Sequence, residues 1–235
     1  PIEIFNGVPA IKSVLLIEII EGQTQYYIGQ QAINRYSNPR SHTQTNSFSF
    51  HSYFKKVPSK MSIKEREIMC TFMAQVYQQI RRQRQELTDS NHVVYIACPS
   101  NSEKWTDNEL RLYADIAWEA GIPLAKIEGQ SVGIIRESRA AFLKARTNPC
   151  SKVSVKEGIL LIDFGSSTVD LTYYSSKYTK KPIDDGGETC GASNVEIKIT
   201  EELKERNPIL NDAITAVPSA DTALLLTMRE AKEKF

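Results

Sequence analysis

The sequence predicts a mixed α/β fold, because short apolar runs typical of strands alternate with longer segments whose apolar residues recur every three or four positions. The first third opens with β-rich runs separated by Asn-Gly and Glu-Gly, which favours a small antiparallel meander. After about residue 91, strand-like and helix-like segments follow one another. With 235 residues, 41% of them hydrophobic, the chain can bury a sizeable core in one large or two small domains.

The first part of the chain is expected to contain a β-meander, a loop and a long helix. The β-rich runs lie at residues 2–5, 10–20 and 25–28. Residues 37–49 have the Ser, Asn, Thr and Pro composition of a loop. Between residues 62 and 87 the apolar spacing of three and four predicts one helix with a single apolar face.

The second part is expected to alternate strands and helices. An apolar strand at residues 93–98 ends at Pro99, and a capping box from Thr106 to Glu109 opens a helix that ends at Gly121. A buried strand at 159–164 and an alternating strand at 168–174 would pair as a tight hairpin around Gly165, Ser166 and Ser167. Further helices are expected at 131–146, at 192–206 before Pro208, and at 219–235, with a glycine-rich loop from 184 to 191.

Composition and charge argue against several classes of protein. Twenty-nine Lys and Arg against twenty-eight Asp and Glu give a net charge of +1, so neither nucleic acid nor an acidic membrane is an expected partner. The longest apolar run is much shorter than the roughly 20 residues that a membrane span needs. Cys70, Cys98, Cys150 and Cys190 form no close pair of the kind used in zinc or redox motifs, which favours reduced thiols in a soluble cytoplasmic protein.

The segment with the clearest chemistry is LLIDFGSSTVD at residues 160–170. It places Asp163 near the end of a strand and small residues in the following turn, where backbone N–H groups can approach a phosphate closely. Asp163 could hold hydrated Mg²⁺, and the Thr168 hydroxyl could hydrogen-bond a terminal phosphate. An ordinary hairpin with a surface aspartate explains the same residues. A protein kinase is set aside, because the other kinase motifs do not precede Asp-Phe-Gly.

Five stretches carry a family resemblance by their order: VVYIACP at 93–99, WEAGI at 118–122, IEGQSVGI at 127–134, IDFGSSTVD at 162–170 and TCGA at 189–192. Together they resemble the nucleotide-binding domain of the 70-kDa heat-shock chaperone family (heat shock protein 70). The family's matching stretches read strand-Pro, helix-Ala-Gly, Asn-Glu-Pro-Thr-Ala-Ala, Asp-Leu-Gly-Gly-Gly-Thr-x-Asp and Leu-Gly-Gly-x-x-Phe-Asp. Weaker similarity extends to residues 2–14, 27–32, 48–55 and 229–232.

The resemblance implies an actin-like ATPase, or ribonuclease H-like, fold that holds ATP between two lobes. Residues 1–90 would form a first-lobe subdomain of meander and long helix. Residues 91–235 would form the second-lobe ribonuclease H-like subdomain and the start of the adenosine-side helical subdomain. Because the family's first phosphate hairpin and its Gly-Gly adenosine motif are not among these residues, the fold would be partial and the chain alone is expected to bind nucleotide weakly or not at all.

The resemblance also implies roles for individual residues. Asp163 would hold Mg²⁺ through water, and Glu128 would orient the metal shell or the attacking water. The remaining implied contacts to ATP or ADP come from Gly165, Ser166, Ser167 and Thr168 as the second phosphate loop, Gly191 and Ala192 at the cleft border, and Lys232 near the ribose or adenine.

Several residues depart from the family pattern. The family's first-lobe lysine aligns with His51, which brings less charge and a shorter reach to a γ-phosphate. Ser166 and Ser167 replace glycines, and Gly129 replaces a proline. ATP hydrolysis in the intact protein therefore depends on whether His51 can replace the lysine, and a histidine without a role is the alternative.

The resemblance thus implies the central part of an atypical heat-shock-like chaperone ATPase that binds ATP with Mg²⁺ in the intact protein and hydrolyses it slowly if His51 can replace the lysine. In that case co-chaperones and client peptides would be partners of the intact protein. One alternative is a hydrolysis-deficient actin-like scaffold or nucleotide-sensing interaction protein. Another is a different actin-like relative, such as a sugar or carboxylate kinase or a cell-shape filament protein. A β-rich peptide-binding domain in the parent would favour the chaperone.

Overall fold

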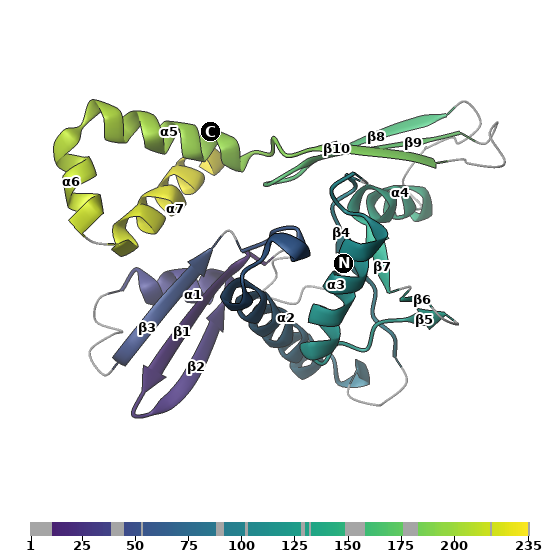
Figure 1. Cartoon of the computed structure of the whole chain (residues 1–235), viewed down its shortest axis with the longest axis horizontal. Coiled ribbons are helices and arrows are strands. Elements are labelled where there is room, and N and C mark those ends of the chain that lie inside the picture. Colours follow the sequence, from purple (N-terminus) through teal and green to yellow (C-terminus); the bar gives the residue numbers. More distant parts are fainter. Residues whose placement is uncertain are drawn as a thin grey trace. The chain divides into compact units, whose positions relative to one another are not determined.

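The computed structural model describes residues 11–38, 45–52, 54–87, 92–101, 103–127, 130–131, 133–148, 158–175, 183–216 and 218–234. The chain is a mixed α/β protein (Figure 1). It divides into two compact units, one made of residues 1–95 and 108–133 and the other of residues 96–107 and 134–235. No helix of the described ranges is both long and apolar enough to cross a membrane.

The first unit is built on a three-stranded antiparallel sheet of order β2-β1-β3. Strands β1 (Val14–Ile20) and β2 (Gln23–Ile28) are joined by a two-residue turn in which Glu21 and Gly22 both have positive φ. The central strand β1 is the more apolar one, and it pairs along its other edge with β3 (Thr45–Ser52). Helix α1 (Gly29–Tyr36) follows β2 directly and packs on the sheet.

Helix α2 (Ile63–Gln83) adds four buried apolar side chains to this unit. Its N-terminus is a capping box, in which the Ser62 hydroxyl accepts from the Glu65 N–H and the Glu65 carboxylate accepts from the Ser62 N–H. One face of α2 is buried, as the three- and four-residue spacing predicted. The core residues of the sheet and of the two helices are Val14, Leu15, Leu16, Ile28, Ala32, Ile33, Ile68, Met69, Phe72 and Met73.

Helix α3 (Asp107–Glu119) and the segment after it complete the first unit. Glu109 accepts a hydrogen bond from the backbone N–H of Ser59, and Arg66 of α2 forms an ion pair with Glu119. A parallel bridge joins Val94 to Leu124. This unit also contains two short 3₁₀ helices, η2 (Pro58–Lys60) and η3 (Gln85–Leu87). A pair of two-residue strands, β5 (Lys126–Ile127) and β6 (Gln130–Ser131), lies later in its sequence.

The second unit contains a parallel strand pair and a three-stranded antiparallel sheet. Strands β4 (Ile96–Cys98) and β7 (Ile134–Arg136) run parallel, and α4 (Glu137–Thr147) follows β7. The sheet has the order β10-β9-β8, with β8 (Ile159–Phe164), β9 (Val169–Tyr174) and β10 (Ile183–Glu188). Helix α4 packs on β8 and β9, and the helices α5 (Ser193–Arg206), α6 (Pro208–Ala216) and α7 (Pro218–Lys234) follow β10.

Four expectations from the sequence are corrected in these elements. Strand β3 begins at Thr45, inside the predicted loop, because its alternating side chains pair with β1. The helix expected from residue 131 begins at Glu137, since residues 134–136 form β7. Residues 183–188 are not a loop but strand β10, held by pairing with β9. Pro208, expected only to end a helix, also begins α6, where a missing N–H carries no penalty.

The strand predicted as buried, β8, is buried on one face only. Its pattern alternates half-buried and exposed residues, and Leu160, Ile162 and Phe164 are 60%, 49% and 77% exposed. The hairpin itself is confirmed, with β8 and β9 antiparallel and Phe164 opposite Val169. The β-rich run expected at residues 2–5 lies outside the described residues.

Candidate functional site

The turn between β8 and β9 is the centre of the candidate site. The N–H of Gly165 donates to the carbonyl of Thr168 across 2.8 Å and closes the turn. Ser166 and Ser167 are exposed, and within the described ranges their N–H groups donate no hydrogen bond to the protein. Two adjacent backbone donors for which no acceptor is found among the described residues therefore lie in an exposed turn, which is an arrangement that suits an anion.

The segment that begins α5 packs directly against this turn. The N–H of Ala192 donates to the Gly165 carbonyl at 3.1 Å, and that of Ser193 donates to the Ser166 carbonyl at 2.7 Å. Gly191 donates to the Ser167 carbonyl at 3.3 Å, and a Cβ at Gly191 would lie 2.4 Å from the Ser166 oxygen. These three donors are occupied by the turn, so the donors left for a ligand are those of the turn itself.

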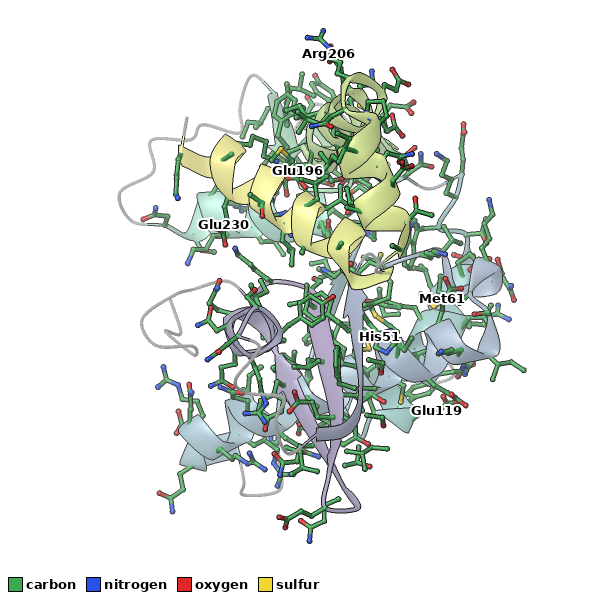
Figure 2. The ribbon with its side chains drawn as sticks, turned by 90° about the vertical axis from the view of Figure 1, so that its left-hand side faces the viewer. His51, Met61, Glu119, Glu196, Arg206 and Glu230 are labelled. Carbon is green, nitrogen blue, oxygen red and sulfur yellow. The ribbon has the colours of Figure 1, made fainter. Side chains whose placement is uncertain are left out.

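A buried acid lies one turn into α5 and connects the turn to α7. Glu196 is fully buried and forms ion pairs with Arg229 at 3.3 Å and with Lys232 at 2.5 Å. Lys232 also donates to the carbonyl of Ala192 at 3.1 Å. Figure 2 labels Glu196 between the side chains of α5 and α7. Lys232, which the sequence associated with the ribose or adenine, thus contacts Ala192, and Ala192 is itself hydrogen-bonded to the turn.

Asp163 lies on the covered face of the hairpin, opposite Asp170 in the strand register. Asp170 is buried and accepts hydrogen bonds from the Ser100 N–H at 2.6 Å and from the Thr168 hydroxyl at 2.6 Å. Because the Thr168 hydroxyl donates to Asp170, it would have to turn away from this carboxylate to donate to a phosphate. Asp163 is half-buried, next to the turn.

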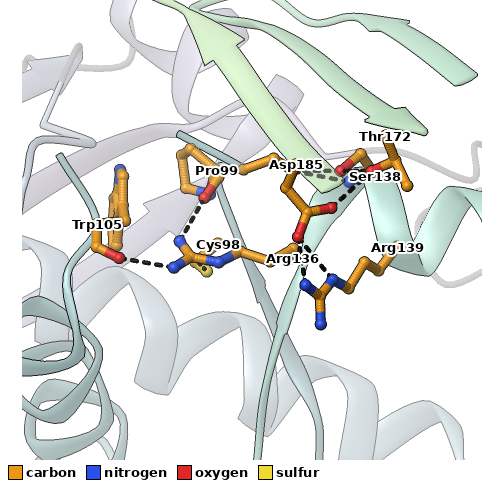
Figure 3. Close-up of polar contacts among 9 residues, drawn as sticks. Cys98, Pro99, Trp105, Arg136, Ser138, Arg139, Thr172 and Asp185 are labelled. Carbon is orange, nitrogen blue, oxygen red and sulfur yellow. Dashed lines mark hydrogen bonds and ion pairs between the residues drawn. The ribbon is translucent and has the colours of Figure 1, made fainter. Parts of the chain in front are cut away.

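A network of buried hydroxyls extends from Asp170 across the covered face of the sheet. The Ser138 hydroxyl is hydrogen-bonded to the hydroxyls of both Ser100 and Thr172. Asp185 accepts from the Thr172 hydroxyl and forms a two-bonded ion pair with Arg139 of α4 (Figure 3). The buried polar groups are satisfied by one another, so this network fixes α4, β4 and the sheet in one arrangement.

Arg136 at the end of β7 fixes the loop that leaves β4. It donates to the carbonyls of Pro99 at 3.0 Å and Trp105 at 2.7 Å, and it lies 3.7 Å from the Cys98 sulfur (Figure 3). Burial raises the pKa of Cys98 to about 11 despite this guanidinium. The thiol is therefore protonated at neutral pH, and it serves as a packing group.

His51 belongs to the first unit, on the edge strand β3, opposite Leu15. Its Nε2 lies 3.0 Å from the Ser49 hydroxyl, and Figure 2 labels it on its strand. Partial burial, with a smaller effect from the charge of Lys64, lowers the pKa of His51 below its ordinary value. The imidazole is accordingly neutral near pH 7.

The predicted residues are distributed as follows. The turn residues 165–168, the pair Gly191 and Ala192, and Lys232 come together in the second unit. Asp163 is on the strand that leads into this turn, and His51 is in the first unit. Glu128 lies outside the described residues. In the described part of the chain, no three His, Cys, Asp or Glu side chains are grouped as ligands for a metal ion.

Sequence reasoning missed several polar residues around the turn. They are Ser100, Lys104, Ser138, Arg139, Asp185 and Glu196. Only one of these had a usable signal: Glu196 falls among apolar neighbours one turn after Gly191, at a position that faces the protein. The others have partners far away in sequence. Lys104, for example, donates to the Thr189 hydroxyl at 3.2 Å.

Comparisons with known proteins give no identification. No protein-family model matches the chain, and no curated protein matches it. The function must therefore be argued from the residues and their geometry.

Proposed function

We propose that this chain is the central part of the nucleotide-binding domain of an atypical 70-kDa heat-shock-like ATPase with an actin-like fold. The observation that carries the proposal is the packing of two segments that the sequence motifs linked to phosphate. Residues 165–168 and 191–193 are distant in sequence, yet three backbone hydrogen bonds join them. The proposal also draws on the order of the motifs in the sequence.

In the proposed site, the N–H groups of the exposed residues Ser166 and Ser167 would bind phosphate oxygens. Lys232 adds a positive charge beside the same turn. The residues present fit a nucleotide with Mg²⁺, because a carboxylate, Asp163, lies next to free backbone donors. Asp163 would hold Mg²⁺ through water, and the ion would neutralise charge on the phosphate oxygens.

Hydrolysis would use the same groups for positioning. Phosphoryl transfer to water depends mainly on orientation and charge neutralisation, and the fixed turn supplies orientation. His51 would supply little charge, because its neutral imidazole replaces a lysine ammonium. This observation favours a second candidate function, a nucleotide-sensing scaffold that does not hydrolyse ATP. Replacement of His51 by lysine should then increase ATP hydrolysis by the intact protein, whereas an unchanged rate would argue against a γ-phosphate role for this position.

The experiment that tests the proposal is an NMR titration of the ¹⁵N-labelled chain with Mg·ATP, because chemical-shift changes detect weak binding residue by residue. The amides of residues 165–168 and 191–193 should shift together and saturate. Mg²⁺ alone and inorganic phosphate are the reference titrations. Asp163→Asn should remove the Mg²⁺ dependence of the shifts, and Asp212→Asn on α6 is the matched control. Shifts scattered over the surface would overturn the proposed function, and so would the absence of Mg·ATP binding by the intact protein.

A further inference from the structure

Glu196 is an acidic side chain with no exposed surface, held between two cations of another helix. Its carboxylate lies 3.3 Å from Arg229 and 2.5 Å from Lys232. The side chains of Arg229 and Lys232 keep 16% and 26% of their surface exposed. Burying a carboxylate is costly even when it is paired, so such a group is weak evidence for a purely stabilising role.

The three charges sum to an excess of one positive charge at the start of α5. Glu196 neutralises one of the two cations, and it restricts both side chains to its own position. Lys232 makes a second contact, from Nζ to the carbonyl of Ala192 at 3.1 Å. This contact places the Lys232 ammonium beside Ala192, the residue whose N–H donates to the Gly165 carbonyl.

The two backbone groups of Ala192 therefore connect two parts of the proposed phosphate site. On one side its N–H fixes the carbonyl of Gly165, and on the other its carbonyl receives Lys232. We infer that Glu196 is a positioning residue that holds the Lys232 ammonium beside the phosphate-binding turn. This inference deepens the proposed function and rests on it.

The other ion pairs of these helices serve as an internal comparison. Lys204 pairs with Asp221, and Arg206 pairs with Glu202 within α5. Glu202 is 59% exposed and lies nearly three turns further along the helix from the Ala192 contact. Glu202→Gln is therefore a matched control, since it makes the same chemical change on the same helix away from the turn.

The first measurement tests the position of Lys232 without any nucleotide. In the Glu196→Gln variant, Lys232 loses its anionic partner and becomes more accessible. Its acylation by an amine-reactive ester, followed by mass spectrometry of the full chain after digestion, should be several-fold faster than in the wild type. Acylation of Lys198 on the exposed side of α5 should be unchanged in the same samples. An unchanged Lys232 rate would show that Glu196 does not hold it and would overturn the inference.

The second measurement tests the consequence for binding, with Mg·ADP as the probe in the same NMR titration. Glu196→Gln should weaken binding by roughly tenfold or more, the loss expected when one charge-assisted hydrogen bond is misplaced. Glu202→Gln should leave the affinity unchanged. In a Lys232→Met background, Glu196→Gln should have little further effect, because Glu196 acts through Lys232.

The outcomes separate the inference from the proposed function. If the wild type binds Mg·ADP and Glu196→Gln binds equally well, the positioning role is wrong and the nucleotide site stands. Full additivity of the two substitutions would overturn it as well, because it would mean that Glu196 acts independently of Lys232. If neither the wild-type chain nor the intact protein binds Mg·ADP, the proposed function fails, and the role of Glu196 at a phosphate site fails with it. A folded spectrum with dispersed amide peaks is the check that each variant is native.

Discussion

At Gly191 the addition of a single methyl group would bring the side chain against closely packed backbone atoms. Its position was predicted from a motif, but the reason for a glycine there comes from the approach of the Ser166 carbonyl. Glu196 and Asp170 could not be assigned roles from the sequence, because their partners lie far along the chain. Asp170 accepts a hydrogen bond from Ser100, 70 residues away, and Lys232 reaches Glu196 across 36. Patterns among neighbouring residues in the sequence do not predict contacts between residues so far apart.

Gly191→Ala should destabilise the protein by about 1–3 kcal/mol, the usual cost of forcing a methyl group into a packed site. Its Cβ would lie 2.4 Å from the Ser166 carbonyl oxygen, a backbone atom that cannot move away alone. Gly186→Ala is the control, since nothing lies within 4 Å of a Cβ at that position. Urea unfolding of the two variants measures the difference. Equal midpoints would contradict the close packing described for Gly191.

His51 should make the protein less stable as the pH falls below about 6.5. Its pKa is lowered in the folded state, first by burial and then by Lys64, so the unfolded chain takes up the proton at higher pH than the folded chain. Above this range both states are neutral and the effect disappears. His51→Gln should therefore lose less stability between pH 7 and pH 5 than the wild type. Parallel slopes of unfolding free energy against pH would contradict the shift.

At the scale of the element, the same sequence signature led to two different contacts. Ser62 and Glu65 have the capping-box spacing at a position that was predicted only as the start of a helix, and Thr106 and Glu109 were predicted as a capping box. The first forms its reciprocal bonds, whereas the Glu109 carboxylate accepts from the backbone of Ser59. Helices α2 and α5 were predicted nearly to their ends because their periodicity is long. Strands β3, β7 and β10 were missed because their pairing, more than their composition, defines them.

Ser62→Ala should cost about 1 kcal/mol, because it leaves the first N–H groups of α2 without their side-chain acceptor. Ser62→Asp keeps an acceptor and should retain most of the stability. Thermal unfolding followed by circular dichroism distinguishes the two variants. If both melt at the same temperature, the side chain does not cap the helix.

The acid side of the same capping box has its own pH dependence. Hydrogen bonds from Lys56, and then from Ser62, lower the pKa of Glu65 to about 2. The stabilising contribution of this carboxylate is complete above its ordinary pKa of about 4.5 and is lost as the pH falls toward 2. In Glu65→Gln this loss should be absent when helix content is followed over that range. An identical acid transition in both proteins would assign it to other carboxylates.

At the scale of the whole molecule, the two units are discontinuous in sequence. The chain leaves the first unit after Tyr95, returns at Asn108 and leaves it again after Gly133. The sequence placed its boundary near residue 90 and expected continuous domains. Composition and spacing cannot reveal that residues 108–133 pack with the first unit, since contacts such as the Val94 to Leu124 bridge involve no recognisable motif.

The two tryptophans of the chain report on different units, Trp105 on the second and Trp118 on the first. Single-tryptophan variants made with Trp118→Phe and Trp105→Phe should therefore follow the units separately by fluorescence. Adding Gly191→Ala should shift the transition reported by Trp105 more than that reported by Trp118. Equal shifts would mean that the two units unfold as one cooperative body.

The hydrogen bond between Ser100 and Asp170 also has a consequence for the nascent protein. During translation at about 5–20 residues per second, Ser100 is made roughly 4–14 seconds before the aspartate that it requires. Over that interval residues 96–107 lack their partner in the hairpin, whereas residues 108–133 can already pack with the first unit. The order of synthesis therefore favours completion of the first unit, and the second unit closes only after the hairpin has left the ribosome.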